Sequence, residues 1–369
     1  MKLEPRSLIP AAILALLVPL ALPSPAQTPL SSQIKAEIAR LEQSLKDKPI
    51  SDPDLKNVAP MISDALKSAQ AAADAGQLYL SLEKLGQAED LLQGARSAAN
   101  RAEVEKTGLP AFESRWAKAS LHLTATDKDA HAHEWTDSAL AVRALAEEAQ
   151  GRAIPLLEGG RGFATATSPK DGLFYVGQAE GEADFSTFCA SLHTEGKRSY
   201  FVLRSLLPEL RVLQEKTNTA FQPPKSIDLH PRFIALNSQI KLAWELDASR
   251  FYAGALYAYL DAVRHYGMLD APPLDASVQE QVRNDVAKLT KELTGSSGDN
   301  SILQLFLERA SSYITHPDGS VPSADEWRGA RVILDQVVPA YYAAQKPAGP
   351  LSTPSGKTVD ITLIRWPYT

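Results

Sequence analysis

The sequence predicts an all-α protein made of stacked antiparallel helical hairpins, a helical-repeat-like array, with a short extended C-terminal tail. Apolar residues recur at helical spacing from Ser31 to about Lys346. The helical segments are bounded by Gly, Pro or Ser and joined by short loops, which favours antiparallel neighbours packed side by side. No segment before the tail alternates apolar and polar residues as a half-buried strand does.

The first 26 residues are expected to be a secretory signal peptide. Lys2 and Arg6 make a basic start, Leu8–Leu22 is an apolar run, and Ser24–Ala26 offers the small residues that signal peptidase requires. The run is short and interrupted by proline, so it does not suit a membrane span. We therefore predict cleavage near Ala26 and a periplasmic or extracellular location for the mature chain.

The rest of the chain has the composition of a protein stabilised by its core. Its single cysteine, Cys189, cannot form an internal disulfide, and 44% of the whole sequence is hydrophobic. The formal net charge is −6, and removing Lys2, Arg6 and Glu4 with the signal peptide leaves −7. This acidic balance argues against nucleic acid or an anionic membrane as the partner. No second apolar stretch is long enough to cross a bilayer, so we predict no transmembrane segment in the mature chain.

The N-terminal helical region, residues 27–123, is expected to hold helices over 31–45, 61–75, 77–105 and 110–123. The first has apolar residues at the spacing of one helical face, at Ile34, Ile38, Leu41 and Leu45. We expect the third to be broken near Gly94. Residues 124–132 (TATDKDAHA) are polar and aperiodic, which predicts a polar connection there.

The helical-hairpin region, residues 133–346, is expected to hold the remaining helices. These are predicted over 133–166, 171–192, 203–221, 231–246, 251–266, 275–293, 301–313 and 323–345. The second of them has a clear stripe of apolar and small residues, which includes Gly177 and Phe185. We therefore expect Gly177 to be a packing position.

The C-terminus differs from the helical body. Residues 347–356 (PAGPLSTPSG) form a linker by composition, and the tail, residues 357–369, follows. Within the tail, Val359, Ile361 and Leu363 alternate with Asp360 and Thr362, which predicts a strand. An isolated strand cannot satisfy its own backbone groups, so we expect the tail to dock on the helical body or on the sheet edge of a partner.

The helical hairpin at 231–266 places small residues where its two helices would cross, with large residues around them. The pattern is Leu242, Ala243, Leu246, Tyr252, Ala255, Leu256, Tyr259 and Ala262. Leu82, Leu85, Gly86, Ala98 and Pro110 follow the same spacing, and Leu173, Val176, Gly177 and Cys189 follow it in part. These residues resemble the tetratricopeptide repeat, a family of helical-hairpin repeats. The resemblance implies an interaction scaffold that binds a protein or peptide partner.

The chain departs from that family at several positions. Gln239 stands where the family prefers Trp, and Glu89 and Glu180 replace an aromatic residue. The three candidate units are also not in tandem, and they cover only part of the chain. An ordinary helical hairpin satisfies the same packing rule, so both interpretations stay open.

The candidate binding residues are Tyr252, Tyr257, Tyr259 and His265, which belong to an aromatic-rich helix. These side chains could line a groove for a peptide or small ligand. The alternative is core packing, because Tyr252, Tyr259 and Tyr266 fall on one helical face with small apolar residues.

No catalytic residue, cofactor or metal site is predicted. His131, His133 and Glu134 form the segment richest in metal-ligating side chains, but a solvated polar loop explains them better. Gly159–Gly162 lacks the strand and the Lys-Ser/Thr pair of a nucleotide-binding loop, so we expect a helix terminus or hinge. Cys189 lies on an apolar stripe, which indicates a buried thiol.

Two functional hypotheses with a discrete site follow, and a structural envelope protein without such a site is the third possibility. The first is an exported helical scaffold that binds a protein or peptide, without evident catalysis. The second is a small-ligand binder or enzyme with a pocket between helical layers near residues 252–265. Several titratable groups with perturbed pKa values in one deep pocket would favour the second hypothesis.

Overall fold

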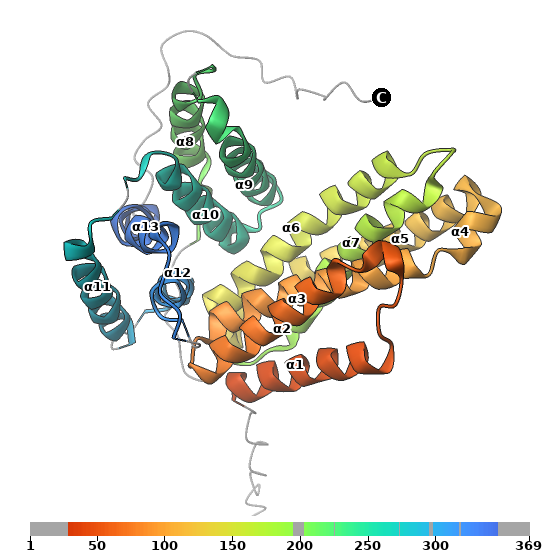
Figure 1. The fold of residues 1–369 in the computed structure, drawn as a ribbon, viewed down its shortest axis with the longest axis horizontal. Helices are drawn as coiled ribbons and strands as arrows, with labels where there is room; N and C mark the ends of the chain where they lie inside the picture. The colour runs from red at the N-terminus through yellow and green to blue at the C-terminus, as the bar shows by residue number, and fades with distance from the viewer. Residues whose placement is uncertain are drawn as a thin grey trace, which may run out of the picture.

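The computed structural model describes residues 29–194 and 203–345, apart from residues 225, 273, 295–297 and 317–318. The predicted signal peptide, the linker and the tail lie outside the described residues. Within the described part, the chain is a packed array of α-helices without a strand, as the sequence predicts (Figure 1). No described helix is long and apolar enough to cross a membrane.

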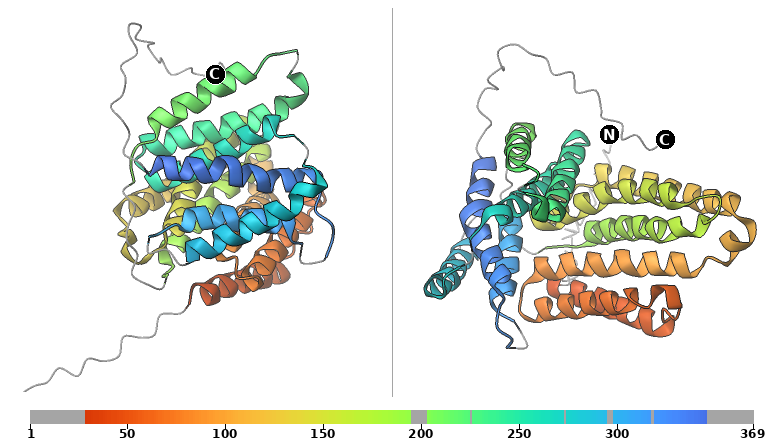
Figure 2. Two further views of the ribbon diagram at one scale, coloured as in Figure 1. Left: turned by 90° about the vertical axis from the view of Figure 1, so that its left-hand side faces the viewer. Right: turned by 45° about the horizontal axis from the view of Figure 1, so that its top comes forward.

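The N-terminal half forms a bundle whose long helices run side by side (Figure 2). Its helices are α1 (Leu30–Asp47), α2 (Val58–Asp74), α3 (Leu78–Ala99), α4 (Ala102–Thr107), α5 (Leu109–Ala132), α6 (Leu140–Phe163) and α7 (Leu173–Ser191). Short 3₁₀ helices lie between them at η1 (Pro53–Leu55), η2 (Trp135–Asp137) and η3 (Pro169–Gly172). The helix α7 packs against both α3 and α6, so it occupies the centre of the bundle.

The C-terminal half packs against one end of this bundle (Figure 1). It consists of α8 (Leu207–Ala220), η4 (Ile227–Leu229), α9 (His230–Ala248), α10 (Tyr252–Asp270), α11 (Ala276–Thr294), α12 (Ser301–Ile314), α13 (Ala324–Val332), the π-helical η5 (Ile333–Val337) and α14 (Val338–Ala344). The helix α10 packs on α6, and α12 packs on both α3 and α6. One continuous apolar core connects the two halves.

Two sequence predictions about helix boundaries are wrong. Residues 124–132 are not a polar connection but the last turns of α5, and the connection lies at 133–139 instead. Leu123 and Ala130, two turns apart, are both buried, so an apolar face continues through this polar segment. Gly94 does not break α3, because it faces α7, and the break comes at Asn100.

Glycines allow α3 and α7 to approach closely. A Cβ atom at Gly177 would overlap the backbone carbonyl of Gln93, and one at Gly181 would lie 2.8 Å from the Cα of Asp90. On the α3 side, a Cβ at Gly86 would lie 2.8 Å from the ring of Phe185. Gly177 is therefore a packing position, as the sequence predicts.

Buried carboxylates from other segments hold the N-termini of several helices. The first turn of a helix has backbone N–H groups without partners inside the helix, and the capping positions of α3, α6, α8 and α10 supply no side-chain acceptor. Carboxylates distant in sequence accept from these N–H groups instead. The pairs are Glu308 with Leu80, Asp299 with Leu140, Asp247 with Leu206 and Glu147 with Gly254, at N···O distances of 2.8, 2.8, 2.7 and 2.8 Å. The contacts of Glu308, Asp299 and Glu147 join the two halves, and that of Asp247 joins α9 to the start of α8 within the C-terminal half.

Candidate functional site

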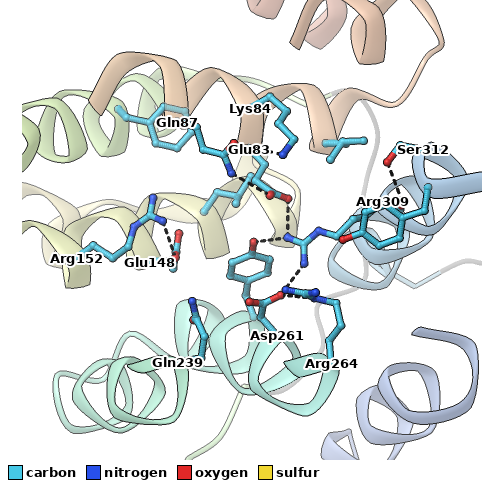
Figure 3. A pocket seen from close by; sticks show the side chains of 15 residues that line it. Glu83, Lys84, Gln87, Glu148, Arg152, Gln239, Asp261, Arg264, Arg309 and Ser312 are labelled. Atoms are coloured by element: carbon cyan, nitrogen blue, oxygen red, sulfur yellow. Dashed lines mark hydrogen bonds and ion pairs between the residues drawn. The ribbon is translucent and has the colours of Figure 1, made fainter. Parts of the chain in front are cut away.

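A polar cavity of about 280 Å³ lies where the two halves meet (Figure 3). We call it the central pocket. Its polar lining comes from α3 (Glu83, Lys84, Gln87), α6 (Glu148, Arg152), α9 (Gln239), α10 (Tyr257, Asp261, Arg264) and α12 (Arg309, Ser312, Tyr313). Both signs of charge therefore converge on one volume from helices of both halves.

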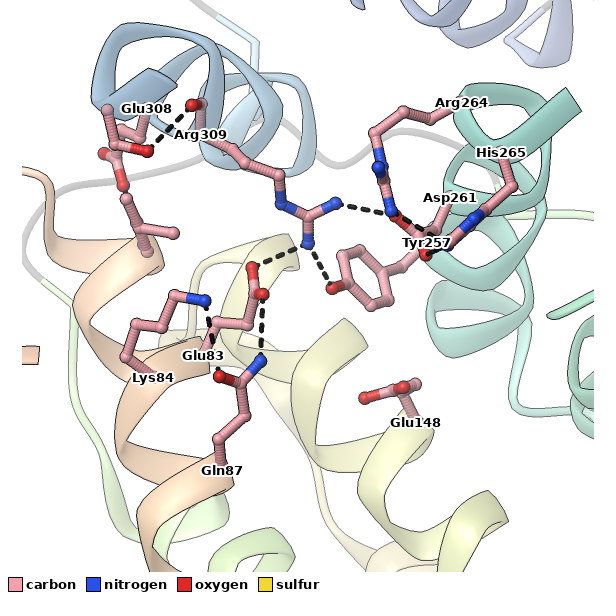
Figure 4. Close-up of polar contacts among 12 residues, drawn as sticks. Glu83, Lys84, Gln87, Glu148, Tyr257, Asp261, Arg264, His265, Glu308 and Arg309 are labelled. Atoms are coloured by element: carbon pink, nitrogen blue, oxygen red, sulfur yellow. Dashed lines mark hydrogen bonds and ion pairs between the residues drawn. The ribbon is translucent and has the colours of Figure 1, made fainter. Parts of the chain in front are cut away.

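Arg309 ties three helices together at one side of the central pocket (Figure 4). From α12, its Nη1 donates to Oδ1 of Asp261 at 2.6 Å, and its Nη2 donates to Oε2 of Glu83 at 2.7 Å. The same Nη2 donates to the hydroxyl of Tyr257 at 2.8 Å. The side chain of Arg309 is only 8% exposed, so these partners replace water around its charge.

Asp261 is the most strongly paired carboxylate of the cluster. It accepts from Nε of Arg264 at 2.9 Å, and Nε2 of His265 lies 3.3 Å from its other oxygen. Burial alone would raise the pKa of Asp261, but the charges of Arg264 and Arg309 and the contact with His265 hold it well below the usual value. Asp261 is therefore a permanent anion of the structural network.

Arg152 faces an excess of carboxylates on another side of the pocket. Its Nη2 lies 2.8 Å from Glu182, and its Nη1 lies 3.3 Å from Glu148. Burial raises the pKa of Glu182 to about 8, although Arg152 opposes the shift, and the neighbouring Asp90 and Glu148 add to it. Burial likewise raises the pKa of Glu148 and of Asp90. One guanidinium does not compensate three buried carboxylates.

Glu148 is the carboxylate that the surrounding protein satisfies least. Among the described residues, its contact is the ion pair with Arg152, and none of them donates a hydrogen bond of normal geometry to it. Figure 3 shows Lys84 from α3 and Gln239 from α9 on opposite sides of the same cavity. Glu148, Lys84 and Gln239 thus form the part of the lining that is available to a ligand.

The structure separates the predicted binding residues into two groups. Tyr257 lines the central pocket, and His265 contacts Asp261 and Arg264 behind the lining. Tyr252 and Tyr259 do not line the pocket. Tyr259 packs against the apolar core, and burial raises its pKa to about 12. Only part of the predicted aromatic cluster therefore reaches the cavity.

The sequence interpretation missed the charged residues of the site. Asp261 and Arg309 lie within apolar helical segments, such as the run SILQLFLERA that contains Arg309, whereas Glu148 and Arg152 lie in the more polar stretch AEEAQGR of α6. The available signal was a charge on an otherwise apolar helical face, which requires a buried partner. The sequence does not show which distant residue is that partner.

The histidine, glycine and cysteine motifs of the sequence lie outside the central pocket. His131 lies in the last turn of α5, where its Nε2 is 3.0 Å from the carbonyl oxygen of Ser249. Gly159–Gly162 belong to the C-terminal turns of α6, and Cys189 is buried in the core, which raises the pKa of its thiol. Within the described ranges, no group of three or more His, Cys, Asp or Glu side chains could hold a metal ion.

Comparison of the chain with protein-family models, with curated proteins and with solved structures finds no match. The fold and the central pocket are therefore the basis for a functional proposal.

Proposed function

We propose that the protein binds a small zwitterionic molecule, such as a free amino acid, in the central pocket. The observation that carries this proposal is the position of Glu148, a buried carboxylate that lines the cavity and lacks a well-formed hydrogen bond from the described residues. Because this carboxylate faces the cavity and accepts no well-formed hydrogen bond from the described residues, a ligand that donates hydrogen bonds to it can replace water there.

The opposite charges of the lining support a ligand with two charges. An ammonium group would pair with Glu148, and a carboxylate would pair with Lys84 or with the outer edge of Arg264. Arg309 and Asp261 are already paired with each other and would set the shape of the pocket. A cavity of about 280 Å³ limits the ligand to a small molecule.

A thermal-shift and calorimetric screen of free amino acids tests the proposal. A ligand at 100 times its Kd stabilises the folded state by about 2.7 kcal/mol, so binding raises the melting temperature measurably. We expect Glu148→Gln to keep the fold, checked by circular dichroism, and to abolish the response. The matched control is Glu158→Gln, an exposed glutamate on the same helix, which should respond as the unchanged protein does.

Two outcomes would refute the proposal. One is that no amino acid binds the unchanged protein. The other is that a binding amino acid binds Glu148→Gln with the same affinity. A polyamine or a small sugar that binds in place of an amino acid, and depends on Glu148, would assign the pocket to a different ligand class.

A protein or peptide partner is the second candidate function, implied by the tetratricopeptide resemblance. The observation that favours it is a hollow along α6 and α9, where the large apolar side chain of Ile154 is exposed. Pull-down of the protein from its own extracellular or periplasmic fraction tests for such a partner.

We also propose that the chain is exported and that residues 1–26 are removed. The basic, apolar and small-residue segments of the N-terminus support this. N-terminal sequencing of the exported protein should begin at Gln27, and Met1 on that protein would contradict the proposal.

A further inference from the structure

A groove extends from the central pocket along α6 and α9. A second cavity of about 420 Å³ shares Arg152 and Gln239 with the central pocket. A third cavity, of about 560 Å³, shares Pro155, Lys241 and Glu245 with the second. We call the second and third cavities the α6–α9 groove.

Much of the wall surface of this groove is apolar. The apolar lining residues include Ile154, Pro155, Leu156, Leu242, Leu246 and Phe251. The side chain of Ile154 is 53% exposed although it lies among other apolar groups. An exposed apolar surface inside a hollow is typical of a docking site.

Two hydrogen-bond acceptors lie in the third cavity of the groove. Gln150 is 1% exposed, and its Oε1 has no hydrogen-bond partner among the described residues. Pro155 has no N–H to donate to the carbonyl group of Gly151, one turn earlier in α6. A buried acceptor without a donor costs about 1–3 kcal/mol, so an occupant with N–H groups is favoured.

The charge of the groove also restricts its occupant. Its third cavity is lined by the carboxylates Asp127, Glu158 and Glu245 and by the single cation Lys241. In the second cavity, Arg152 faces Asp90 and Glu182, whose pKa values burial raises. A basic occupant is therefore favoured over an acidic one. The three requirements together are apolar side chains, backbone N–H groups and a positive charge.

We propose that residues 357–369 of this same chain occupy the α6–α9 groove. This tail has the apolar residues Val359, Ile361 and Leu363 at alternating positions, and its backbone supplies N–H donors. Lys357 and Arg365 outweigh Asp360, so the side chains of residues 357–369 carry a net charge of +1. The groove adjoins the central pocket and shares Arg152 and Gln239 with it, but the proposal does not depend on the proposed ligand.

The linker is long enough for this contact. The helix α14 ends at Ala344 and packs on α10, and α10 packs on both α9 and α6. The helix α14 and the groove-forming helices α6 and α9 therefore all pack on one helix, α10, which is about 10–12 Å in diameter. Residues 346–357 can span as much as ~40 Å when extended.

A double-mutant cycle tests the contact in the whole protein. The two changes are Ile154→Gln and deletion of residues 357–369. We expect each change alone to lower the melting temperature by ~2–4 °C, because each removes the same apolar contact. The combined variant should melt no lower than either single variant, because the second change has nothing left to remove.

The control is Leu121→Gln, which changes a side chain that is 73% exposed on α5 and does not line the groove. Its effect should add to that of the deletion. The proposal is overturned if the effects of Ile154→Gln and the deletion are additive. It is also overturned if the deletion leaves the melting temperature unchanged.

A peptide experiment distinguishes the tail of this chain from a separate partner. A labelled peptide of residues 357–369 should bind the tail-deleted protein saturably in fluorescence anisotropy, and more weakly at high salt. It should bind the full chain at least tenfold more weakly, because the attached tail already fills the groove. Equal binding to both proteins would assign the groove to a separate peptide and overturn the proposal, and so would binding to neither.

Discussion

The contact between α3 and α7 and the junction around the central pocket represent two different ways of packing helices. The first is close-packed through glycine, where Gly177 and Gly181 allow the backbones to approach. The second is held by buried ion pairs, with Arg309 between Asp261 and Glu83, and it encloses a cavity. The same helix, α3, takes part in both contacts.

The two contacts differ in the electrostatic free energy that burying them costs. A close apolar contact gains dispersion energy and removes water at no electrostatic cost. A buried charge must first lose its hydration, and its partners often do no more than compensate for this loss. Charged groups at a junction are thus weak evidence for stability. Together with a cavity, they are stronger evidence for a binding function.

The largest effect is expected at the charged junction. Arg309→Met would leave the half-buried Glu83 without its cation and the buried Asp261 with Arg264 alone, and breaking such a pair costs about 3–5 kcal/mol. Urea unfolding of the variant measures this cost. Arg309→Lys should recover part of it, because a lysine keeps the charge but not the planar geometry. A loss below about 1 kcal/mol would show that the junction does not depend on these ion pairs.

A smaller loss is expected at the close-packed contact. Gly177→Ala would place a methyl group against the backbone of Gln93, so the helices must separate, at a cost of about 1–3 kcal/mol. Gly162→Ala is the matched control, because this glycine also lies in a helix, does not line the α6–α9 groove, and a Cβ atom there would meet no neighbouring segment within 4 Å. That change should stabilise the protein by about 0.5–1 kcal/mol. Equal effects of the two substitutions on thermal unfolding would remove the distinction between the two kinds of contact.

The hairpin of α9 and α10 provides a second close-packed contact. Ala255 is fully buried, so Ala255→Leu should overpack the crossing and cost about 1–2 kcal/mol, near the lower end of the range for such changes. Ala117→Leu, at an exposed position of α5, should change the stability by no more than about 0.5 kcal/mol. Unchanged thermal stability of Ala255→Leu would contradict the packing role on which the tetratricopeptide resemblance depends.

The sequence predicts the close-packed contacts much better than the charged ones. Gly177 and Ala255 belong to local apolar stripes, so their helical spacing is enough to identify them as packing positions. The partners of Arg309 lie 48 and 226 residues away, and no local period connects them. The central pocket therefore depends on tertiary contacts that spacing does not encode. The same limit explains residues 124–132, where a polar composition conceals a face that is buried through Leu123 and Ala130.

The pH dependence of stability gives the finest distinction between the two contacts. Burial raises the pKa of Glu182 to about 8 and that of Glu308 to about 7, from 4.5 for an unperturbed glutamate. Between the unperturbed pKa of 4.5 and the raised values, the folded protein holds more protons than the unfolded chain. The free energy of unfolding therefore falls as the pH rises from about 4.5 to 8. Glu182→Gln cannot titrate, so urea unfolding of this variant across that range should show a shallower fall than the unchanged protein. Gly177→Ala lowers stability without removing a titrating group, so its unfolding free energy should follow the pH in parallel with that of the unchanged protein. If both variants follow the same pH profile as the unchanged protein, Glu182 is ionised throughout, and the excess of carboxylates around Arg152 has no energetic consequence.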